Sequence, residues 1–307
     1  MNHYKSGFVT LLGRPNVGKS TLLNKLIGEK VTITSPIAQT TRNKLRGILT
    51  TQDSQIIFID TPGIHKPQHL LGQTLVNNAK SAINGVDLIL LIFDSSHKPG
   101  RGDNYIKEFL KSNKSKIMVV LNKWDLVNPK ERLTRINQYK EMVNDSSINF
   151  HVLSAVEGDG CKELINIIKN FLPIGPLLYP KDSKCDLPIV TILSELVREQ
   201  VLLNTREEIP HSVAVNIDKI IERENHKNVK AKKLTAILAT IIVERKSQKG
   251  ILIGKNGSML KNIGKSARLN INKLIEGPVY LELFVKVVPN WRKKQSKLIE
   301  LGYEADI

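Results

Sequence analysis

Apolar and polar positions follow two different patterns along the first part of the chain. Between residues 8 and 172, continuous apolar runs alternate with stretches in which apolar residues stand three or four positions apart. The runs predict buried strands at 8–13, 55–60, 88–94, 116–123 and 150–155, and the spaced positions predict helices that include 19–27 and 161–172. This alternation predicts an α/β fold, a mostly parallel sheet with helices on both faces.

The pattern changes after a stretch that contains four prolines and one glycine, residues 172–188. Proline and glycine punctuate local structure, so we expect a domain over 1–172, a linker over 173–188 and a second domain over 189–307. The second part predicts a helix at 187–204, strands at 211–220 and 234–245, two helices within 250–275, a strand at 279–288 and a short basic helix. This order predicts a smaller α+β domain.

Charge and composition narrow the class of partner. The 307 residues carry a formal net charge of +17, which favours a polyanionic partner, either nucleic acid or anionic lipid. Between Lys227 and Lys273 there are 12 basic residues and one acid, Glu244, so the second part holds a local basic segment. We predict no signal peptide and no transmembrane segment, and we read the two cysteines as unrelated reduced thiols.

A glycine-rich loop lies between the first predicted strand and the first predicted helix. Gly13 and Gly18 stand five residues apart, and Lys19 and Ser20 follow directly. Backbone N–H groups of such a loop wrap a phosphate, the lysine reaches the β- and γ-phosphates, and the serine holds Mg²⁺. The predicted phosphate-binding residues are Gly13, Arg14, Pro15, Asn16, Val17, Gly18, Lys19 and Ser20. A chance glycine-rich turn is the alternative.

Two further segments fit the binding of a nucleoside triphosphate. The sequence DTPG ends a predicted strand, and it would place Asp60 near the magnesium and the Gly63 N–H near the γ-phosphate, with Thr61 and Pro62 between them. The sequence QTTR stands where a γ-phosphate-sensing switch loop belongs, and it contains Gln39, Thr40, Thr41 and Arg42. We favour Thr41 over Thr40 as the second magnesium ligand. An ordinary turn and an ordinary polar loop are the alternatives.

A third segment decides which base is bound. The sequence NKWD places Asn122, Lys123 and Asp125 at the end of a strand. A carboxylate there accepts two hydrogen bonds from guanine, whereas adenine lacks both donors and would leave a buried charge unpaired. Asn122 would connect the base loop to the phosphate loop, and Lys123 would lie along the ring. We add Ser154 and Ala155, whose backbone N–H would contact the guanine O6. The predicted ligands are therefore GTP and GDP.

The residue after DTPG is Ile64, where many GTPases have a glutamine that orients the attacking water. An isoleucine side chain cannot hydrogen-bond to the attacking water and orient it. We therefore expect slow intrinsic hydrolysis, with the water positioned by backbone groups, a cation or a partner.

The basic segment contains the turn Gly254-Lys255-Asn256-Gly257 between two helical stretches. A GxxG turn lets a nucleic-acid backbone pass close to two helix ends. The following helix predicts Leu260, Ile263, Ala267, Ile271 and Leu274 inside. The predicted RNA-binding residues are Ile253, Gly254, Lys255, Asn256, Gly257, Lys261, Lys265 and Arg268. The element order fits a type II KH domain. A basic solvated face on a structural domain is the alternative, and residues 290–297 either extend the groove or form a charged helix end.

The motifs GRPNVGKS, QTTR, DTPG and NKWD, followed by a proline-rich stretch, IGKNG and a late ELGY, resemble the Era family of bacterial GTPases over nearly the whole chain. The resemblance implies a factor that acts in assembly of the small (30S) ribosomal subunit and binds single-stranded RNA near the 3′ end of 16S ribosomal RNA. It implies a cytoplasmic protein, with some members at the membrane surface, and a K⁺ ion held through Asn16.

Three other functions stay open at this point. A GTP-sensing RNA-binding adaptor would hydrolyse GTP negligibly. A tRNA-modification GTPase needs an additional domain, for which this chain offers no region. A GTPase at the membrane surface would use the basic segment on anionic lipid, and salt-sensitive binding fits both lipid and RNA.

Overall fold

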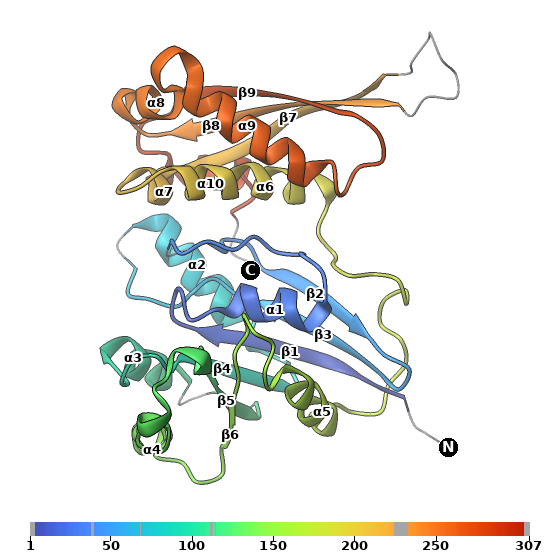
Figure 1. Cartoon of the computed structure of the whole chain (residues 1–307), viewed down its shortest axis with the longest axis vertical. Helices are drawn as coiled ribbons and strands as arrows, with labels where there is room; N and C mark the ends of the chain where they lie inside the picture. Colours follow the sequence, from blue (N-terminus) through green and yellow to red (C-terminus); the bar gives the residue numbers. More distant parts are fainter. Residues whose placement is uncertain are drawn as a thin grey trace. The chain divides into compact units, whose positions relative to one another are not determined.

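The structure is a computed structural model that describes residues 4–37, 40–67, 69–110, 113, 115–223 and 233–303. The chain divides into two compact units between Asp186 and Leu187 (Figure 1). The first unit holds a six-stranded sheet, and the second holds a three-stranded sheet. None of the helices in the ranges just given is long and apolar enough to cross a membrane.

The first unit alternates strands and helices. Its elements are β1 (Lys5–Gly13), α1 (Lys19–Ile27), β2 (Leu45–Thr50), β3 (Ser54–Asp60), α2 (Leu70–Ser81), β4 (Leu88–Asp94), α3 (Arg101–Leu110), β5 (Ile117–Asn122), the 3₁₀ turns η1 (Trp124–Leu126) and η2 (Pro129–Glu131), α4 (Arg132–Val143), β6 (Asn149–Val152) and α5 (Cys161–Phe171). The strand order is β2-β3-β1-β4-β5-β6. Neighbouring strands are parallel except β2 and β3.

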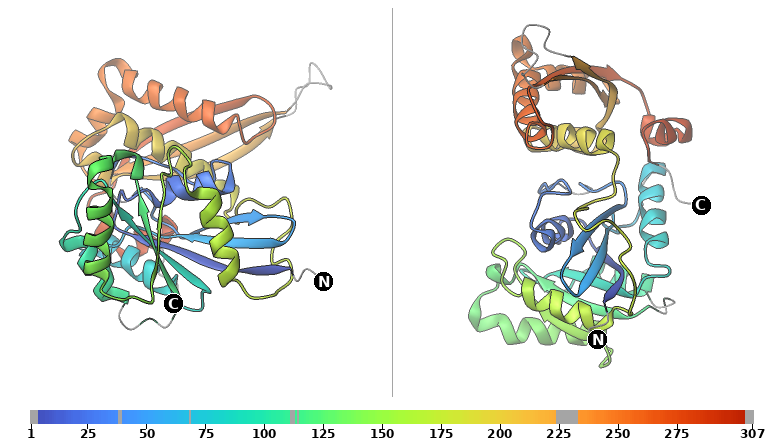
Figure 2. Two further views of the ribbon diagram at one scale, coloured as in Figure 1. Left: turned by 60° about the horizontal axis from the view of Figure 1, so that its bottom comes forward. Right: turned by 90° about the vertical axis from the view of Figure 1, so that its right-hand side faces the viewer.

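Helices cover both faces of this sheet. Buried residues of α2, α3 and α4 pack with β4 and β5 in one hydrophobic cluster. Helices α1 and α5 contact each other, and the right-hand view of Figure 2 shows α1 and α2 on opposite faces. The predicted α/β architecture is therefore confirmed. Because the carboxyl ends of parallel strands meet at one edge of the sheet, the loops after β1, β3, β5 and β6 are brought together there.

Strand β2 was not predicted from the sequence. It lies at the edge of the sheet, antiparallel to β3, with Leu45 opposite Asp60 and Thr50 opposite Gln55. The segment LRGILT is short and contains a charged residue and a glycine, so its pattern alone is weak. Its pairing with the fully buried β3 makes it a strand.

Residues 173–186, which we call the edge segment, are hydrogen-bonded to the first unit. The Ser6 N–H donates to the Pro173 carbonyl at 3.1 Å, and the Ile48 N–H donates to the Lys184 carbonyl at 2.8 Å. Arg46 on β2 forms an ion pair with Asp186 at 3.1 Å. The stretch that the composition predicts as a linker therefore lies along the strands of the first unit as far as Asp186.

The second unit has the predicted order of elements. They are α6 (Ile189–Asn204), α7 (Ile209–Ser212), β7 (Ala214–Arg223), β8 (Leu234–Val243), α8 (Lys246–Ile253), the 3₁₀ turn η3 (Lys255–Gly257), α9 (Ser258–Ile271), β9 (Val279–Val287), the 3₁₀ turn η4 (Trp291–Lys293) and α10 (Gln295–Glu300). The sheet order is β7-β8-β9, with β7 antiparallel and β9 parallel to β8. Helices α6 and α9 pack together along the sheet (Figure 1).

Two details of the second unit differ from the predictions. Strand β7 begins at Ala214 rather than 211, because Ile209–Ser212 form the short helix α7. Leu274 was expected inside the domain but lies beyond the end of α9 and is 48% exposed. Ile263, Ala267 and Ile271 are buried as predicted.

Candidate functional site

The glycine-rich loop between β1 and α1 has the conformation that a phosphate cradle requires. Asn16 has a φ of 65°, and Gly18 has a φ of 94° directly before α1. A Cβ atom at Gly18 would lie 2.3 Å from Asn122 Nδ2, so only glycine fits there. Helix α1 starts at Lys19, and its free N–H groups face the loop, which favours an anion.

Two cations of the loop have different surroundings. Arg14 was expected to bind phosphate, but its guanidinium is paired with Asp103 on α3 at 2.6 Å, so its side chain is turned toward that helix. The buried Lys19 Nζ donates to the carbonyl oxygens of Gly13 at 3.3 Å and Arg14 at 3.0 Å. Burial lowers the pKa of Lys19 to about 8, and the nearby Asp60 carboxylate offsets part of that shift.

Three oxygen ligands converge next to the loop. Ser20 Oγ donates to Asp60 Oδ2 at 2.7 Å, Thr41 Oγ1 donates to the same atom at 3.2 Å, and the two hydroxyl oxygens are 2.8 Å apart. Asp60 Oδ1 is buried and has no hydrogen-bond partner in the described part of the chain. Burial raises the pKa of the Asp60 carboxyl, against the lowering effect of Lys19 and the two hydroxyls.

This cluster fits a magnesium ion, because Mg²⁺ prefers hard oxygen ligands, and an unpartnered buried carboxylate oxygen is an available acceptor. Thr41 rather than Thr40 reaches the cluster, because Thr40 Oγ1 donates to the Ile37 carbonyl at 2.6 Å. Gln39 of the predicted switch lies outside the described residues. Arg42 is buried.

A pocket opens between the loop and the predicted switch. It is lined by Pro15, Asn16, Gly18, Lys19, Ser20, Thr21, Ile33, Thr34, Ser35, Thr40, Thr41 and Gly63. Thr21 and the stretch 33–35 were not predicted as site residues. No sequence motif marks residues 33–35. They line the pocket because the chain between α1 and β2 passes beside it.

The DTPG segment lies against the phosphate loop. Thr61 Oγ1 donates to the Leu11 carbonyl at 2.7 Å, and a Cβ atom at Gly63 would lie 2.5 Å from the Pro15 nitrogen. The Ile64 N–H donates to the Gly13 carbonyl at 3.1 Å, and the Ile64 side chain is 1% exposed in the hydrophobic cluster. Ile64 is therefore a core residue, and the segment presents backbone rather than a polar side chain to the phosphate loop.

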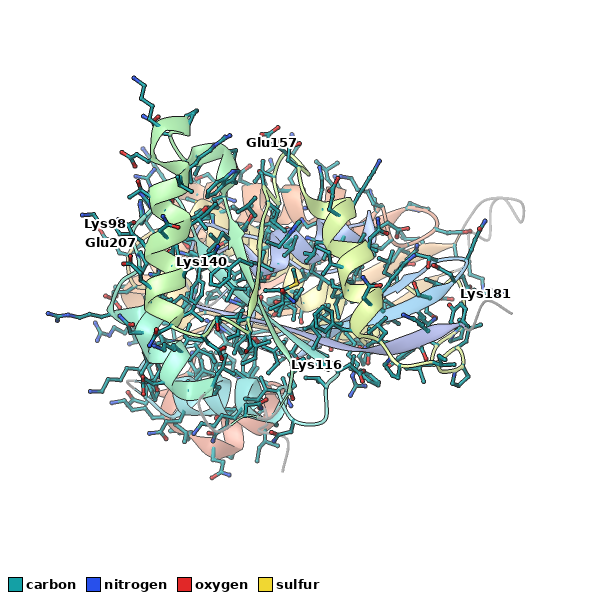
Figure 3. The ribbon with its side chains drawn as sticks, turned by 90° about the horizontal axis from the view of Figure 1, so that it is seen from below. Lys98, Lys116, Lys140, Glu157, Lys181 and Glu207 are labelled. Atoms are coloured by element: carbon teal, nitrogen blue, oxygen red, sulfur yellow. The ribbon has the colours of Figure 1, made fainter. Side chains whose placement is uncertain are left out.

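The predicted base-binding residues come from two loops. Asn122 ends β5, Lys123 follows it with a φ of 62°, and Asp125 is exposed in η1. Ser154 and Ala155 lie in the loop between β6 and α5, which also contains Glu157, labelled in Figure 3. The structure therefore brings together residues that lie about thirty positions apart in sequence.

Asn122 connects these loops to the phosphate loop. Its Nδ2 donates to the Val17 carbonyl at 2.8 Å, as the sequence analysis expected of this residue. Its Oδ1 accepts a hydrogen bond from the Ala155 N–H at 3.0 Å. The Ala155 N–H, which the sequence assigns to the guanine O6, donates to Asn122 in this structure, so its contact with the base stays a prediction.

The second unit contains a groove between α9 and β9. It is lined by Gly257, Leu260, Lys261, Gly264, Lys265, Arg268, Tyr280, Leu281, Glu282 and Leu283. Four of the predicted RNA-binding residues, one glycine and three cations, are among them. Lys255 and Asn256 are exposed in the turn at its end, and Ile253 and Gly254 precede them. The β9 side of the groove was not predicted, because no motif marks it.

The segment after β9 is structural. Trp291 is fully buried and donates from Nε1 to the Ser212 carbonyl at 2.9 Å, and Arg292 is paired with Glu244 at 2.6 Å. Residues 290–297 were expected either to extend the groove or to form a charged helix end. Trp291 and Arg292 are engaged within the unit, which does not favour an extension of the groove at these two residues. Those two side chains fix the end of β9 to the unit.

Both units match known protein families. The model of the 50S ribosome-binding GTPase family matches residues 8–123, and that of the KH domain matches residues 208–292. GTPase Era of Crocosphaera subtropica is 52% identical over 304 residues, which is 99% of this chain and 94% of that protein. GTPase Era of Staphylococcus haemolyticus is 47% identical over 306 residues, which is 100% of this chain and 99% of that protein.

Solved structures agree. The structure of Era in complex with MgGDPNP and nucleotides 1506–1542 of 16S ribosomal RNA has a TM-score of 0.93 and 40% identity, covering 98% of this chain and 100% of that one. A variant of Aquifex aeolicus Era bound to GDP·AlF₄⁻ has a TM-score of 0.91 and 39% identity, covering 98% and 99%.

The fold and the two sites define a P-loop GTPase joined to a C-terminal KH domain. The resemblance stated from the motifs is confirmed at full length. The chain belongs to the Era family of GTPases, and its enzymatic activity is the hydrolysis of GTP.

Proposed function

We propose that this GTPase binds single-stranded RNA near the 3′ end of 16S ribosomal RNA and acts in assembly of the 30S subunit. The observation that carries the proposal is the groove between α9 and β9. Lys261, Lys265 and Arg268 line it, and the GKNG turn lies at its end. Such a groove binds an RNA backbone through charge and leaves unpaired bases free for hydrogen bonds.

In the first unit, we assign the phosphates of GTP to the loop of residues 13–20 and to Lys19, and the guanine to Asn122, Lys123 and Asp125. Ser20 and Thr41 would hold Mg²⁺, and Asp60 would orient it from its buried position. When bound, Mg²⁺ neutralises charge on the β- and γ-phosphates. The loop N–H groups and Lys19 stabilise the charge that develops during in-line attack by water.

The water that attacks the γ-phosphate must be positioned without a glutamine. Ile64 is in the core, so backbone groups of the phosphate loop and of residues 61–64, a cation or a partner must orient the water, and intrinsic hydrolysis is slow. A K⁺ ion held by Asn16 is a second part of this proposal. Asn16 Nδ2 donates to the Pro36 carbonyl at 2.8 Å, which places the residue between the phosphate loop and the switch. Faster hydrolysis in K⁺ than in Na⁺ would test it.

From the proposed ribosomal partner we infer a cytoplasmic location. Contact with the inner face of the cell membrane stays a prediction of the resemblance, for which the basic groove would be the available surface.

RNA binding tests the proposal. A labelled RNA of nucleotides 1506–1542 of 16S ribosomal RNA and a scrambled RNA of equal length would be titrated by fluorescence anisotropy at fixed salt, with the GDPNP-bound and GDP-bound protein. We expect the matching RNA to bind at least ten times more tightly than the scrambled one, since base contacts discriminate while phosphate contacts do not.

The double variant Lys261→Glu, Lys265→Glu should abolish binding. Lys246→Glu, Lys273→Glu is the charge-matched control, because both are exposed lysines that do not line the groove. Equal binding of both RNAs would overturn the sequence-specific function. Tighter binding to anionic vesicles than to either RNA would favour the membrane alternative, and phosphate release no faster than without protein would favour a GTP-sensing adaptor.

A further inference from the structure

Lys123 is held by a carboxylate that no motif includes. Its Nζ lies 2.6 Å from Asp94 Oδ2 at the end of β4. Asp94 and Asn122 are register partners on the parallel strands β4 and β5, so the two strand ends bring the lysine and the aspartate together. Both side chains are mostly buried, with 29% of the lysine and 13% of the aspartate exposed.

The backbone next to the Asp94 side chain is fixed from two directions. The Tyr139 hydroxyl of α4 donates to the Asp94 carbonyl at 2.9 Å, and Arg135 donates to the Ser95 carbonyl at 2.6 Å. Ser95 in turn donates from Oγ to the Asn122 carbonyl at 2.6 Å. The segment after β4 is thus hydrogen-bonded to α4 on one side and to the base-binding motif on the other.

The carboxylate itself is oriented. Asp94 Oδ1 accepts hydrogen bonds from the Ser96 N–H at 3.1 Å and the Ser96 hydroxyl at 2.5 Å, which leaves Oδ2 for Lys123. Burial raises the pKa of the Asp94 carboxyl, but the hydrogen bonds from Lys123 and Ser96 outweigh burial, and the net pKa is lowered. The group is therefore an anion at neutral pH.

The chain contains the same local motif a second time, without the lysine. Residues 94–96 and 145–147 both read Asp-Ser-Ser. Asp145 Oδ1 accepts from the Ser147 N–H at 2.9 Å and the Ser147 hydroxyl at 2.6 Å, so the turn is built in the same way. Asp145 is exposed, whereas Asp94 is not. The turn by itself therefore does not require the ion pair, which is a separate feature of Asp94.

We propose that Asp94 is a positioning residue for guanine recognition: its carboxylate holds the Lys123 ammonium so that the lysine stem stays along the base. This inference rests on the proposed role of residues 122–125 in binding guanine. Asp94 acts through Lys123 and not on the phosphates. Its loss should therefore speed nucleotide release and raise the KM for GTP, while kcat at saturating GTP stays unchanged.

The test is a double-mutant cycle on the full-length protein, with a fluorescent GDP analogue and stopped-flow measurement of its release. The variants are Asp94→Asn, Lys123→Met and both together, with Asp145→Asn as the matched control. Asparagine can keep an oxygen acceptor for Ser96, but it replaces the charged oxygen that faces Lys123 with an NH₂ donor, so it removes the ion pair. We expect Asp94→Asn to speed release about five- to tenfold, a modest factor because the ion pair is partly exposed. Asp145→Asn should leave release unchanged.

The cycle separates positioning from a general structural effect. If Asp94 acts through Lys123, the double variant releases GDP as fast as Lys123→Met alone. Independent, additive effects of the two substitutions, or an unchanged rate in Asp94→Asn, would overturn the inference. Asp125→Ala tests the underlying guanine site separately: unchanged GDP affinity in that variant would overturn the proposed base site itself, and the inference with it.

Discussion

Asn122 donates a hydrogen bond from Nδ2 to the backbone carbonyl of Val17 at 2.8 Å, although 105 positions separate them in the sequence. The other end of the same amide accepts from the Ala155 N–H. One buried side chain thus connects the phosphate loop, the end of β5 and the loop before α5. If the proposed site is right, the position of the base and the position of the phosphates are coupled through this one residue.

Removal of this amide should weaken nucleotide binding as a whole. Asn122→Ala leaves the Val17 carbonyl and the Ala155 N–H without their partner, each at a cost of about 1 to 3 kcal/mol when buried. We expect GDP and GTP affinity to fall by about one to two orders of magnitude, measured by titration with a fluorescent nucleotide. Asn84→Ala, at an exposed asparagine, is the control. A loss confined to GTP would contradict the coupling.

Lys19 should take up a proton when a nucleotide binds at alkaline pH. Its pKa is lowered to about 8 by burial, and the negative phosphates favour its charged form, so the pKa rises on binding. At pH 8.5 calorimetry in buffers of different ionisation enthalpy should show net proton uptake. At pH 6.5 Lys19 is protonated in both states, so its contribution should vanish. If the slope of binding enthalpy against buffer ionisation enthalpy is the same at both pH values, the proposed rise in the Lys19 pKa on binding is contradicted.

The same shift has a consequence for the stability of the nucleotide-free protein. Between pH 8 and the ordinary lysine value of 10.5, the unfolded chain binds a proton at Lys19 that the folded chain has lost. The free energy of unfolding therefore gains a contribution that rises with pH through this window.

A glutamine at position 64 should not supply the catalytic group that this chain lacks. The Ile64 side chain is 1% exposed and belongs to the hydrophobic cluster that also contains Leu12 and Phe93. Ile64→Gln would bury an amide among apolar groups, and it should lower the free energy of unfolding by about 2 to 4 kcal/mol without faster phosphate release. Ile64→Val, which keeps the site apolar, should cost about 1 kcal/mol. Faster hydrolysis in Ile64→Gln would show that the side chain reaches the phosphates.

The features that sequence predicts here depend on local backbone chemistry. The phosphate loop needs glycines and a helix start at fixed spacing, so Gly13 to Ser20 are readable in one segment. The magnesium cluster needed one choice between adjacent threonines. The backbone path decides that choice: the Thr40 hydroxyl donates to the Ile37 carbonyl, and the Thr41 hydroxyl donates to Asp60.

The features that sequence misses depend on pairing between distant segments. Asp94 ends a strand in an ordinary serine turn, and only the register of β4 with β5 brings it to Lys123. The path of the edge segment is a second case. Its prolines predict a linker. Its composition does not indicate that it is hydrogen-bonded to the buried Gln55 side chain, which lies 123 positions before Leu178 in the sequence.

Gln55 should fix the edge segment to the sheet. Its side chain is fully buried, and its Oε1 accepts from the Leu178 and Tyr179 N–H groups at 2.8 and 2.9 Å. Its Nε2 donates to the Tyr179 carbonyl at 2.9 Å and to Thr50 Oγ1 at 3.0 Å. Gln55→Ala removes four hydrogen bonds at once, so we expect a loss of about 2 to 4 kcal/mol in the free energy of unfolding.

The choice of control makes this prediction specific. Gln52 stands three residues earlier, is exposed, and should tolerate alanine within about 0.5 kcal/mol. Limited proteolysis supplies the second measurement, because a segment released from the sheet exposes its backbone to a protease. Gln55→Ala should be cut within residues 173–186 well before Gln52→Ala or the parent protein. If both variants resist cleavage equally, the hydrogen bonds of the flanking segments hold residues 173–186 in place without Gln55.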